Sequence, residues 1–168
     1  MPSALVAVDT NFLLDLALPR DVAHDALEVI RQRIPGAKIV ILPTVLDELD
    51  YLCHDAPDAT TRRLARHALE NMVREWKFHP KVLTDVGRDI IESIGDKLRA
   101  RGIVPEAERN DSYLIAEAAL AGCDFLVSSD SHVRDADRTK LAITLKGCDV
   151  GVVVVCTPRE IVTRFGGK

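Results

Sequence analysis

Short apolar runs alternate along the chain with longer segments of helical periodicity. The apolar runs predict strands, each buried on both faces, at 4–8, 38–43, 124–130 and 151–156. Three- and four-residue spacing of apolar positions predicts helices over 11–17, 21–33, 59–76, 85–101 and 111–121, with two more starting at Pro43 and Pro158. Strands that alternate with helices are typical of an α/β fold. We therefore predict a three-layer sandwich, in which helices flank a central parallel sheet of about four to five strands.

The chain shows no internal repeat and no clear linker. Its 168 residues favour one domain over 1–168. The stretch 55–109 is helical in character throughout, and we expect it to form a helical insertion within that domain. Thr44 and Asp47 resemble a capping arrangement for the helix that starts at Pro43.

Composition limits the classes of function. Hydrophobic residues make up 47% and charged residues 29% of the chain, which is typical of a soluble globular protein. A net charge of −4 argues against non-specific coating of nucleic acid, although it leaves room for a local basic groove. No apolar run reaches the twenty or so residues that span a bilayer, so we expect no membrane partner. Four cysteines without a CxxC pair indicate reduced thiols in a cytoplasmic protein.

Four acidic residues follow successive elements at what should be one edge of the sheet. Asp9 and Asp130 come after the first and third predicted strands. Glu48 lies one turn into the helix after the second strand, and Asp111 starts the helix that leads to the third. Ligands of open parallel sheets bind beyond the carboxyl ends of the strands, so these side chains could converge there.

Converging carboxylates repel one another unless a cation lies among them. An all-oxygen cluster without Cys or His suits Mg²⁺ or Mn²⁺ rather than zinc. Such ions activate water and stabilise displacement at phosphorus, so the pattern indicates metal-dependent phosphodiester cleavage.

Each acid also has a simpler structural interpretation. Asp9 and Asp111 could each cap a helix, Glu48 could be a solvated surface acid, and Asp130 could open a turn. The metal-site hypothesis depends on all four falling at the same end of successive elements. His132 lies two residues after Asp130, and we expect it to be a surface residue without a catalytic role.

Four segments, in order, resemble the motif blocks of PIN domains, a family of small metal-dependent ribonucleases: "VAVDTNFLLDLA", "LPTVLDELDYL", "NDSYLIAEAALAGCDFLVSSD" and "VVVVCTPREIV". The resemblance covers roughly 4–54 and 108–165. It implies a parallel-sheet fold and an acidic metal site of the residues Asp9, Glu48, Asp111 and Asp130. It also implies that Thr10, Asn11 and Ser129 support these acids. The family often has a basic residue directly before the fourth acid, where this chain has Ser129.

The resemblance implies an RNA substrate, and many members are toxins of toxin–antitoxin pairs. It thereby implies either an antitoxin protein as a partner or a role in RNA processing. It also implies that the protein forms a homodimer. The basic residues that could contact RNA phosphates are Arg62, Arg63, Arg66, Arg109 and Arg134, although the first three could equally form a solvated helix face.

Two phosphotransfer classes also place an Asp after the first strand. The haloacid dehalogenase type needs a second Asp where this chain has Asn11, and a receiver domain needs a Lys near its last strand, where this chain offers Arg159. Both therefore fit poorly. The alternative that stays open is a non-catalytic PIN-like module for RNA binding or assembly.

Overall fold

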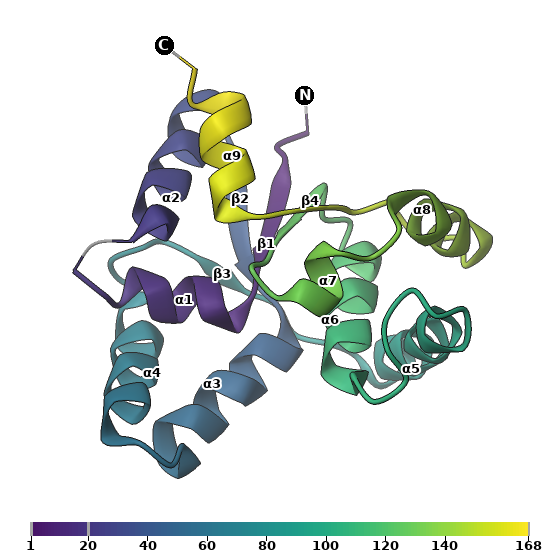
Figure 1. Ribbon diagram of the computed structural model, residues 1–168, viewed down its shortest axis with the longest axis horizontal. Coiled ribbons are helices and arrows are strands. Elements are labelled where there is room, and N and C mark those ends of the chain that lie inside the picture. The colour runs from purple at the N-terminus through teal and green to yellow at the C-terminus, as the bar shows by residue number, and fades with distance from the viewer. Residues whose placement is uncertain (1, 20, 168) are drawn as a thin grey trace.

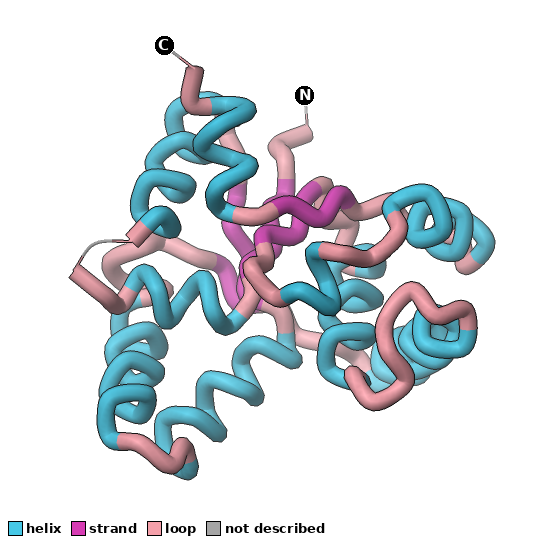
Figure 2. The backbone as a smooth tube through the Cα atoms, viewed as in Figure 1, coloured by secondary structure: helices cyan, strands magenta, loops and turns pink. Residues whose placement is uncertain are grey.

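A five-stranded parallel sheet forms the centre of the molecule. The computed structural model describes residues 2–19 and 21–167. The strands lie in the order β3-β2-β1-β4-β5 (Figures 1 and 2). Their bounds are Leu5–Val8 (β1), Lys38–Ile41 (β2), His79–Pro80 (β3), Phe125–Val127 (β4) and Val154–Cys156 (β5). The predicted α/β fold with a parallel sheet is confirmed.

Helices cover both faces of this sheet. In Figure 1, α1, α2 and α9 lie on one side of the strands, and α5, α6 and α8 lie on the other. This arrangement gives the three layers, and it is the one expected when right-handed crossovers run in both directions along a parallel sheet. The helix bounds are Thr10–Leu16 (α1), Val22–Arg33 (α2), Pro43–Asp55 (α3), Ala59–Asn71 (α4), Asp85–Ala100 (α5), Arg109–Leu120 (α6), Ser131–Arg134 (α7), Arg138–Gly147 (α8) and Pro158–Phe165 (α9).

The central strand β1 determines where the polar residues emerge. Val6, Ala7 and Val8 are buried, because helices cover both faces of this strand. Val8 pairs with Val127 of β4, and the backbone amide of Asp9 donates to the Val127 carbonyl at 3.1 Å. Asp9 therefore leaves the sheet directly beside the end of β4, at the carboxyl edge of the sheet.

The sequence predicts that residues 55–109 are helical throughout. The structure differs from this prediction. These residues contain α4 and α5, but His79 and Pro80 between them form β3, an edge strand that pairs with β2. The predicted helix over 59–76 ends at Asn71, and the chain then turns toward this strand. This stretch is consequently built into the main sheet and is not a purely helical addition.

The predicted cap at Thr44 is wrong. Helix α3 begins after Leu42 without a side-chain cap among the described residues. Thr44 turns instead toward α6, where its amide and its hydroxyl donate to the carboxylate of Glu117. This contact ties the start of α3 to the middle of α6. Across the part of the chain that the structure describes, no helix is long and apolar enough to span a membrane.

Candidate functional site

All four acids that the sequence singles out face one small cavity at the carboxyl edge of the sheet. Asp9, Glu48, Asp111 and Asp130 line it, together with Thr10, Asn11, Leu114, Ser128 and Val133. They come from the end of β1, from α3, from the start of α6 and from the end of β4. The cavity has a volume of about 40 Å³. A water molecule occupies roughly 30 Å³ in the liquid, so the space suits an ion better than an organic ligand.

Asp9 is the most deeply buried of these acids, at 5% exposed. It caps α1, because its Oδ1 accepts a 2.8 Å hydrogen bond from the amide of Phe12. Its Oδ2 accepts a 2.6 Å hydrogen bond from the hydroxyl of Ser128. Burial raises the pKa of Asp9 from 3.8 to about 6, although these two hydrogen bonds oppose the rise. The capping role and the cavity-lining role therefore coexist in one side chain.

Glu48 reaches the cavity from α3 and is linked to the first helix. The hydroxyl of Thr10 donates to Oε2 of Glu48 at 2.5 Å. Thr10 itself is buried at the start of α1, directly after Asp9. Its hydroxyl thus holds Glu48 against the start of α1.

Asp111 and Asp130 face each other across the opposite side of the cavity. Burial raises the pKa of Asp111 to about 6, and the negative charges of Asp130 and Glu108 add to the rise. Asp130 caps the short helix α7 through a 2.9 Å hydrogen bond from the amide of His132. Its own amide donates to the hydroxyl of Ser128 at 3.1 Å. The same Ser128 hydroxyl therefore bridges Asp9 and the backbone of Asp130.

His132, which the sequence places near the site as a surface residue, lies directly against this acidic group. Its Nδ1 is 3.3 Å from Oδ2 of Asp111, 3.5 Å from Oδ1 of Asp130 and 3.8 Å from Oε1 of Glu108. The side chain is partly exposed, as expected, but it contacts three carboxylates. Glu108 was not predicted. The separation of two residues between Asp130 and His132 was the available signal.

The supporting residues are only partly those expected. Thr10 makes its contact with Glu48, and Asn11 lines the cavity from an exposed position. Ser129, expected to support the acids, has an exposed side chain, and only its backbone amide acts on Asp9. The hydroxyl that holds Asp9 belongs to Ser128. The supporting role expected of the Ser129 side chain therefore belongs to Ser128, one residue earlier in the chain.

The five candidate arginines are not equivalent. Arg62 donates to the backbone carbonyls of Ala56 and Pro57, so it closes the turn between α3 and α4. Arg134 forms a two-point ion pair with its neighbour Asp135. The remaining three, Arg63, Arg66 and Arg109, have exposed side chains. Arg109 is the first residue of α6, two residues before Asp111.

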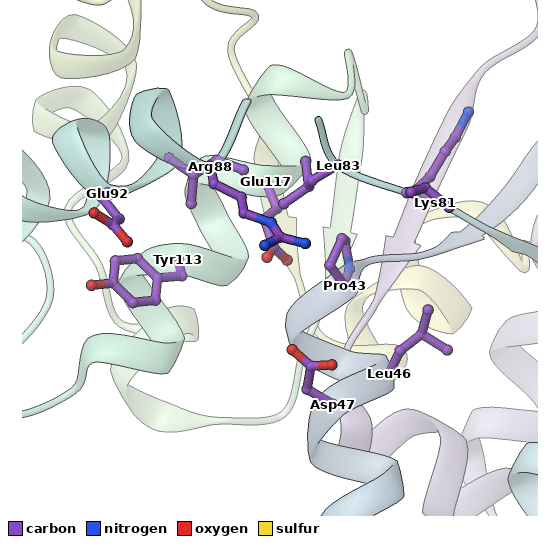
Figure 3. Close-up of a pocket in the computed structure, with 11 residues that line it drawn as sticks. Pro43, Leu46, Asp47, Lys81, Leu83, Arg88, Glu92, Tyr113 and Glu117 are labelled. Atoms are coloured by element: carbon purple, nitrogen blue, oxygen red, sulfur yellow. The ribbon is translucent and has the colours of Figure 1, made fainter. Parts of the chain in front are cut away.

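A larger cavity of about 490 Å³ lies between α3, α5 and α6. Figure 3 shows Arg88, Asp47 and Glu117 among the side chains around it. Glu117 is 4% exposed, and burial raises its pKa while the hydrogen bonds from Thr44 oppose the rise. Glu117 therefore has a defined structural task at the base of this cavity.

The donor set of the small cavity fits Mg²⁺ or Mn²⁺. Its four carboxylates supply oxygen ligands, and its interior is too small for an organic cofactor. Burial is the main cause of the raised pKa values of Asp9 and Asp111, and the negative charge of Asp130 adds to both. A bound divalent cation would offset the negative charge of these acids.

Comparison with known proteins supports the fold assignment. No protein-family profile matches the chain, and no curated protein matches it in sequence. Solved structures similar to it include VapBC2 from Rickettsia felis bound to a promoter DNA fragment (14% identity, TM-score 0.60, 91% of this chain and 98% of that chain covered). FitAcB from Neisseria gonorrhoeae aligns at 14% identity with a TM-score of 0.57, covering 92% of this chain and 98% of the other.

A third structure is VapBC-5 from Mycobacterium tuberculosis, described as a member of the VapBC family of toxin–antitoxin systems. It aligns at 18% identity with a TM-score of 0.54 and covers 92% of this chain and 98% of that one. These alignments span nearly the whole length of both partners. The chain therefore has an α/β fold of the PIN-like type, and the shared fold includes most of residues 55–109.

Proposed function

We propose that this protein is a metal-dependent endoribonuclease of the PIN class, which hydrolyses phosphodiester bonds of RNA. The observation that carries the proposal is the convergence of Asp9, Glu48, Asp111 and Asp130 on one cavity from four separate elements. A single acid could be a cap or a surface residue. Four carboxylates at one edge of a parallel sheet are costly to hold together, and a cation offsets that cost.

Asp9, Asp111 and Asp130 would hold Mg²⁺ or Mn²⁺, and Glu48 would hold a second ion or orient the attacking water. When bound, the cation would supply Lewis-acid activation of water and neutralise charge at the scissile phosphate. Ser128 and Thr10 hold the carboxylates of Asp9 and Glu48 in place. Because Asp9 is fixed by three hydrogen-bonding groups, its oxygens would meet the cation without reorganisation.

The similar solved structures suggest a biological setting. One of them, VapBC-5, is described as a member of a family of toxin–antitoxin systems, so we propose that this chain, one PIN-like domain over 1–168, acts as a toxin with an antitoxin protein as partner. A homodimer and a cytoplasmic location belong to the same proposal. RNA phosphates would meet Arg109, which is exposed and lies two residues before Asp111 at the start of α6. Arg63 and Arg66 are the other exposed candidates.

A non-catalytic PIN-like module that binds RNA or assembles with other proteins is the alternative. Such a module has no need of the four acids. Their presence around one cavity, with hydrogen bonds that hold two of them, favours the enzyme.

The direct experiment is cleavage of an RNA pool by the purified protein. We expect cleavage with Mg²⁺ or Mn²⁺, none with EDTA, and none by a folded Asp130→Asn variant. Binding of the pool without cleavage under any of these metal conditions would support the non-catalytic module instead.

A further inference from the structure

His132 adds a nitrogen donor at the rim of the acidic cavity. Its Nδ1 lies within 3.8 Å of three carboxylate oxygens, those of Asp111, Asp130 and Glu108. One donor atom from each of Glu108, Asp111 and His132 lies within 4.8 Å of the others. The imidazole comes from α7, while Glu108 and Asp111 come from the start of α6. This group is therefore assembled by the fold and not by a local sequence motif.

The distances suit coordination of one small cation. Two ligand atoms bound at about 2.1 Å, with an angle between 90° and 110°, lie roughly 3.0–3.4 Å from each other. The Nδ1 to Oδ2 distance between His132 and Asp111 is 3.3 Å, the Nδ1 to Oε1 distance between His132 and Glu108 is 3.8 Å, and all three ligand atoms lie within 4.8 Å of one another. Each of the three side chains is partly exposed, so a hydrated ion has access.

We propose that His132, Asp111 and Glu108 form a second metal position beside the four-acid cavity, selective for a divalent transition metal such as Mn²⁺ over Mg²⁺. Imidazole nitrogen is a good ligand for transition metals, whereas Mg²⁺ strongly prefers oxygen. Asp111 would be a ligand at both positions. The inference rests on the proposed metal-dependent function only because the two positions share this residue. Occupancy of the second position would orient Asp111 toward the first.

The competing interpretation is that the imidazole pairs directly with these carboxylates and stands where a cation would otherwise bind. The two interpretations predict opposite results when the ring is removed. As a ligand, His132 strengthens metal binding, so its loss weakens it. As a competing cation, His132 opposes metal binding, so its loss strengthens it.

The experiment is a titration with Mn²⁺ and, separately, with Mg²⁺ on the full chain and its His132→Ala variant. Removing even supporting groups of a metal site often costs 10- to 100-fold in affinity, so we expect His132→Ala to lose at least roughly tenfold for Mn²⁺. For Mg²⁺ we expect less than about a threefold change, because its ligands are oxygens. Electron spin-echo spectroscopy of the Mn²⁺-loaded wild type should show modulation from a coordinated ¹⁴N nucleus, absent in His132→Ala.

His54→Ala is the matched control. His54 is an exposed histidine, and among the described residues its Nδ1 pairs with a single carboxylate, that of Asp50 at 3.5 Å. This variant should keep both the Mn²⁺ affinity and the ¹⁴N modulation. Equal or tighter Mn²⁺ binding by His132→Ala, or a wild type without ¹⁴N modulation, would overturn the inference. If either result is found and the wild-type protein still cleaves RNA, the second metal position is wrong but the proposed ribonuclease function stands.

Discussion

The hydroxyl of Ser128 donates a 2.6 Å hydrogen bond to Oδ2 of Asp9, although the two residues are 119 positions apart. They meet because β1 and β4 are parallel neighbours whose last residues, Val8 and Val127, are paired. The same hydroxyl accepts the amide of Asp130 at 3.1 Å. Ser128 therefore couples two acids of the cavity, and several properties of the protein should depend on it.

Replacing this serine should affect the ionisation of Asp9. In Ser128→Ala, Asp9 loses a hydrogen bond that lowers its pKa, so the pKa should rise above its wild-type value of about 6. At pH 8, where Asp9 is charged, the metal-free protein should lose roughly 1–3 kcal/mol of unfolding free energy. Carboxyl NMR titration and urea unfolding measure the two effects. Ser129→Ala is the control, since its side chain is exposed, and an equal effect there would refute the assignment to Ser128.

The buried charge of Asp9 should make the stability of the metal-free protein depend on pH. The pKa of Asp9 is raised from 3.8 to about 6, so between these values the folded state holds a proton that the unfolded state has lost. Unfolding free energy therefore falls as pH rises through this window, by roughly 3 kcal/mol for this group. Asp9→Asn keeps the capping oxygen and removes the charge. Above pH 6 it should be at least as stable as the wild type, as measured by urea unfolding across the pH range.

Asp58→Asn is the control for this comparison. Asp58 caps α4 through a 2.7 Å hydrogen bond from the amide of Thr61, as Asp9 caps α1 through Phe12, but Asp58 is exposed. This change should not produce the stabilisation expected of Asp9→Asn. A loss of stability in Asp9→Asn at every pH would contradict the claim that the buried charge of Asp9 costs stability, because the capping oxygen is still present in that variant.

Glu117 should be essential for anchoring α3. Its carboxylate accepts the hydroxyl of Thr44 at 2.7 Å and the amide at 3.1 Å. Glu117→Ala leaves both donors of the half-buried Thr44 without this partner and should cost roughly 2–3 kcal/mol of unfolding free energy. Glu117→Gln keeps an acceptor oxygen and avoids burying a charge, so it should cost less than half as much. Urea unfolding of the two variants decides the point, and equal losses would contradict it.

The sequence was sufficient for the layers of the fold but not for its weaker elements. The apolar runs of β1, β2, β4 and β5 are strong signals because most residues of these strands are buried. Strand β3 is two residues long and contains Pro80, so it has no alternation to detect. Helix α8 buries only Leu141, Thr144 and Leu145, which leaves its periodicity faint.

The candidate site was predictable where it depends on topology and not where it depends on side-chain geometry. The four acids could be placed together because strand ends share an edge. The choice between Ser128 and Ser129 could not be made, because a strand buried on both faces shows no alternation that tells which residue turns inward. The contact between His132 and Glu108 joins residues 24 positions apart, and it depends on how α7 packs beside α6.

Metal binding should stabilise the folded chain. A ligand that binds only the folded state at about 100 times its Kd adds roughly 2.7 kcal/mol. For a protein of this size the Tm should then rise by roughly 5–10 °C with Mn²⁺, and EDTA should reverse the rise. Asp111→Asn should abolish most of the shift, because Asp111 faces the cavity. Asp135→Asn should retain it, since Asp135 pairs with Arg134. A shift equal in both variants would place the metal elsewhere.

The central claim is that four carboxylates act together in RNA cleavage. The most direct measurement compares the rate of metal-dependent RNA cleavage by the wild type with that of four separate variants, Asp9→Asn, Glu48→Gln, Asp111→Asn and Asp130→Asn. Each is first shown to fold, and Asp47→Asn serves as the control, since Asp47 precedes Glu48 but faces the larger cavity. We predict a loss of at least about 100-fold in each of the four and less than about threefold in the control. Wild-type rates in any folded variant of the four would contradict the account.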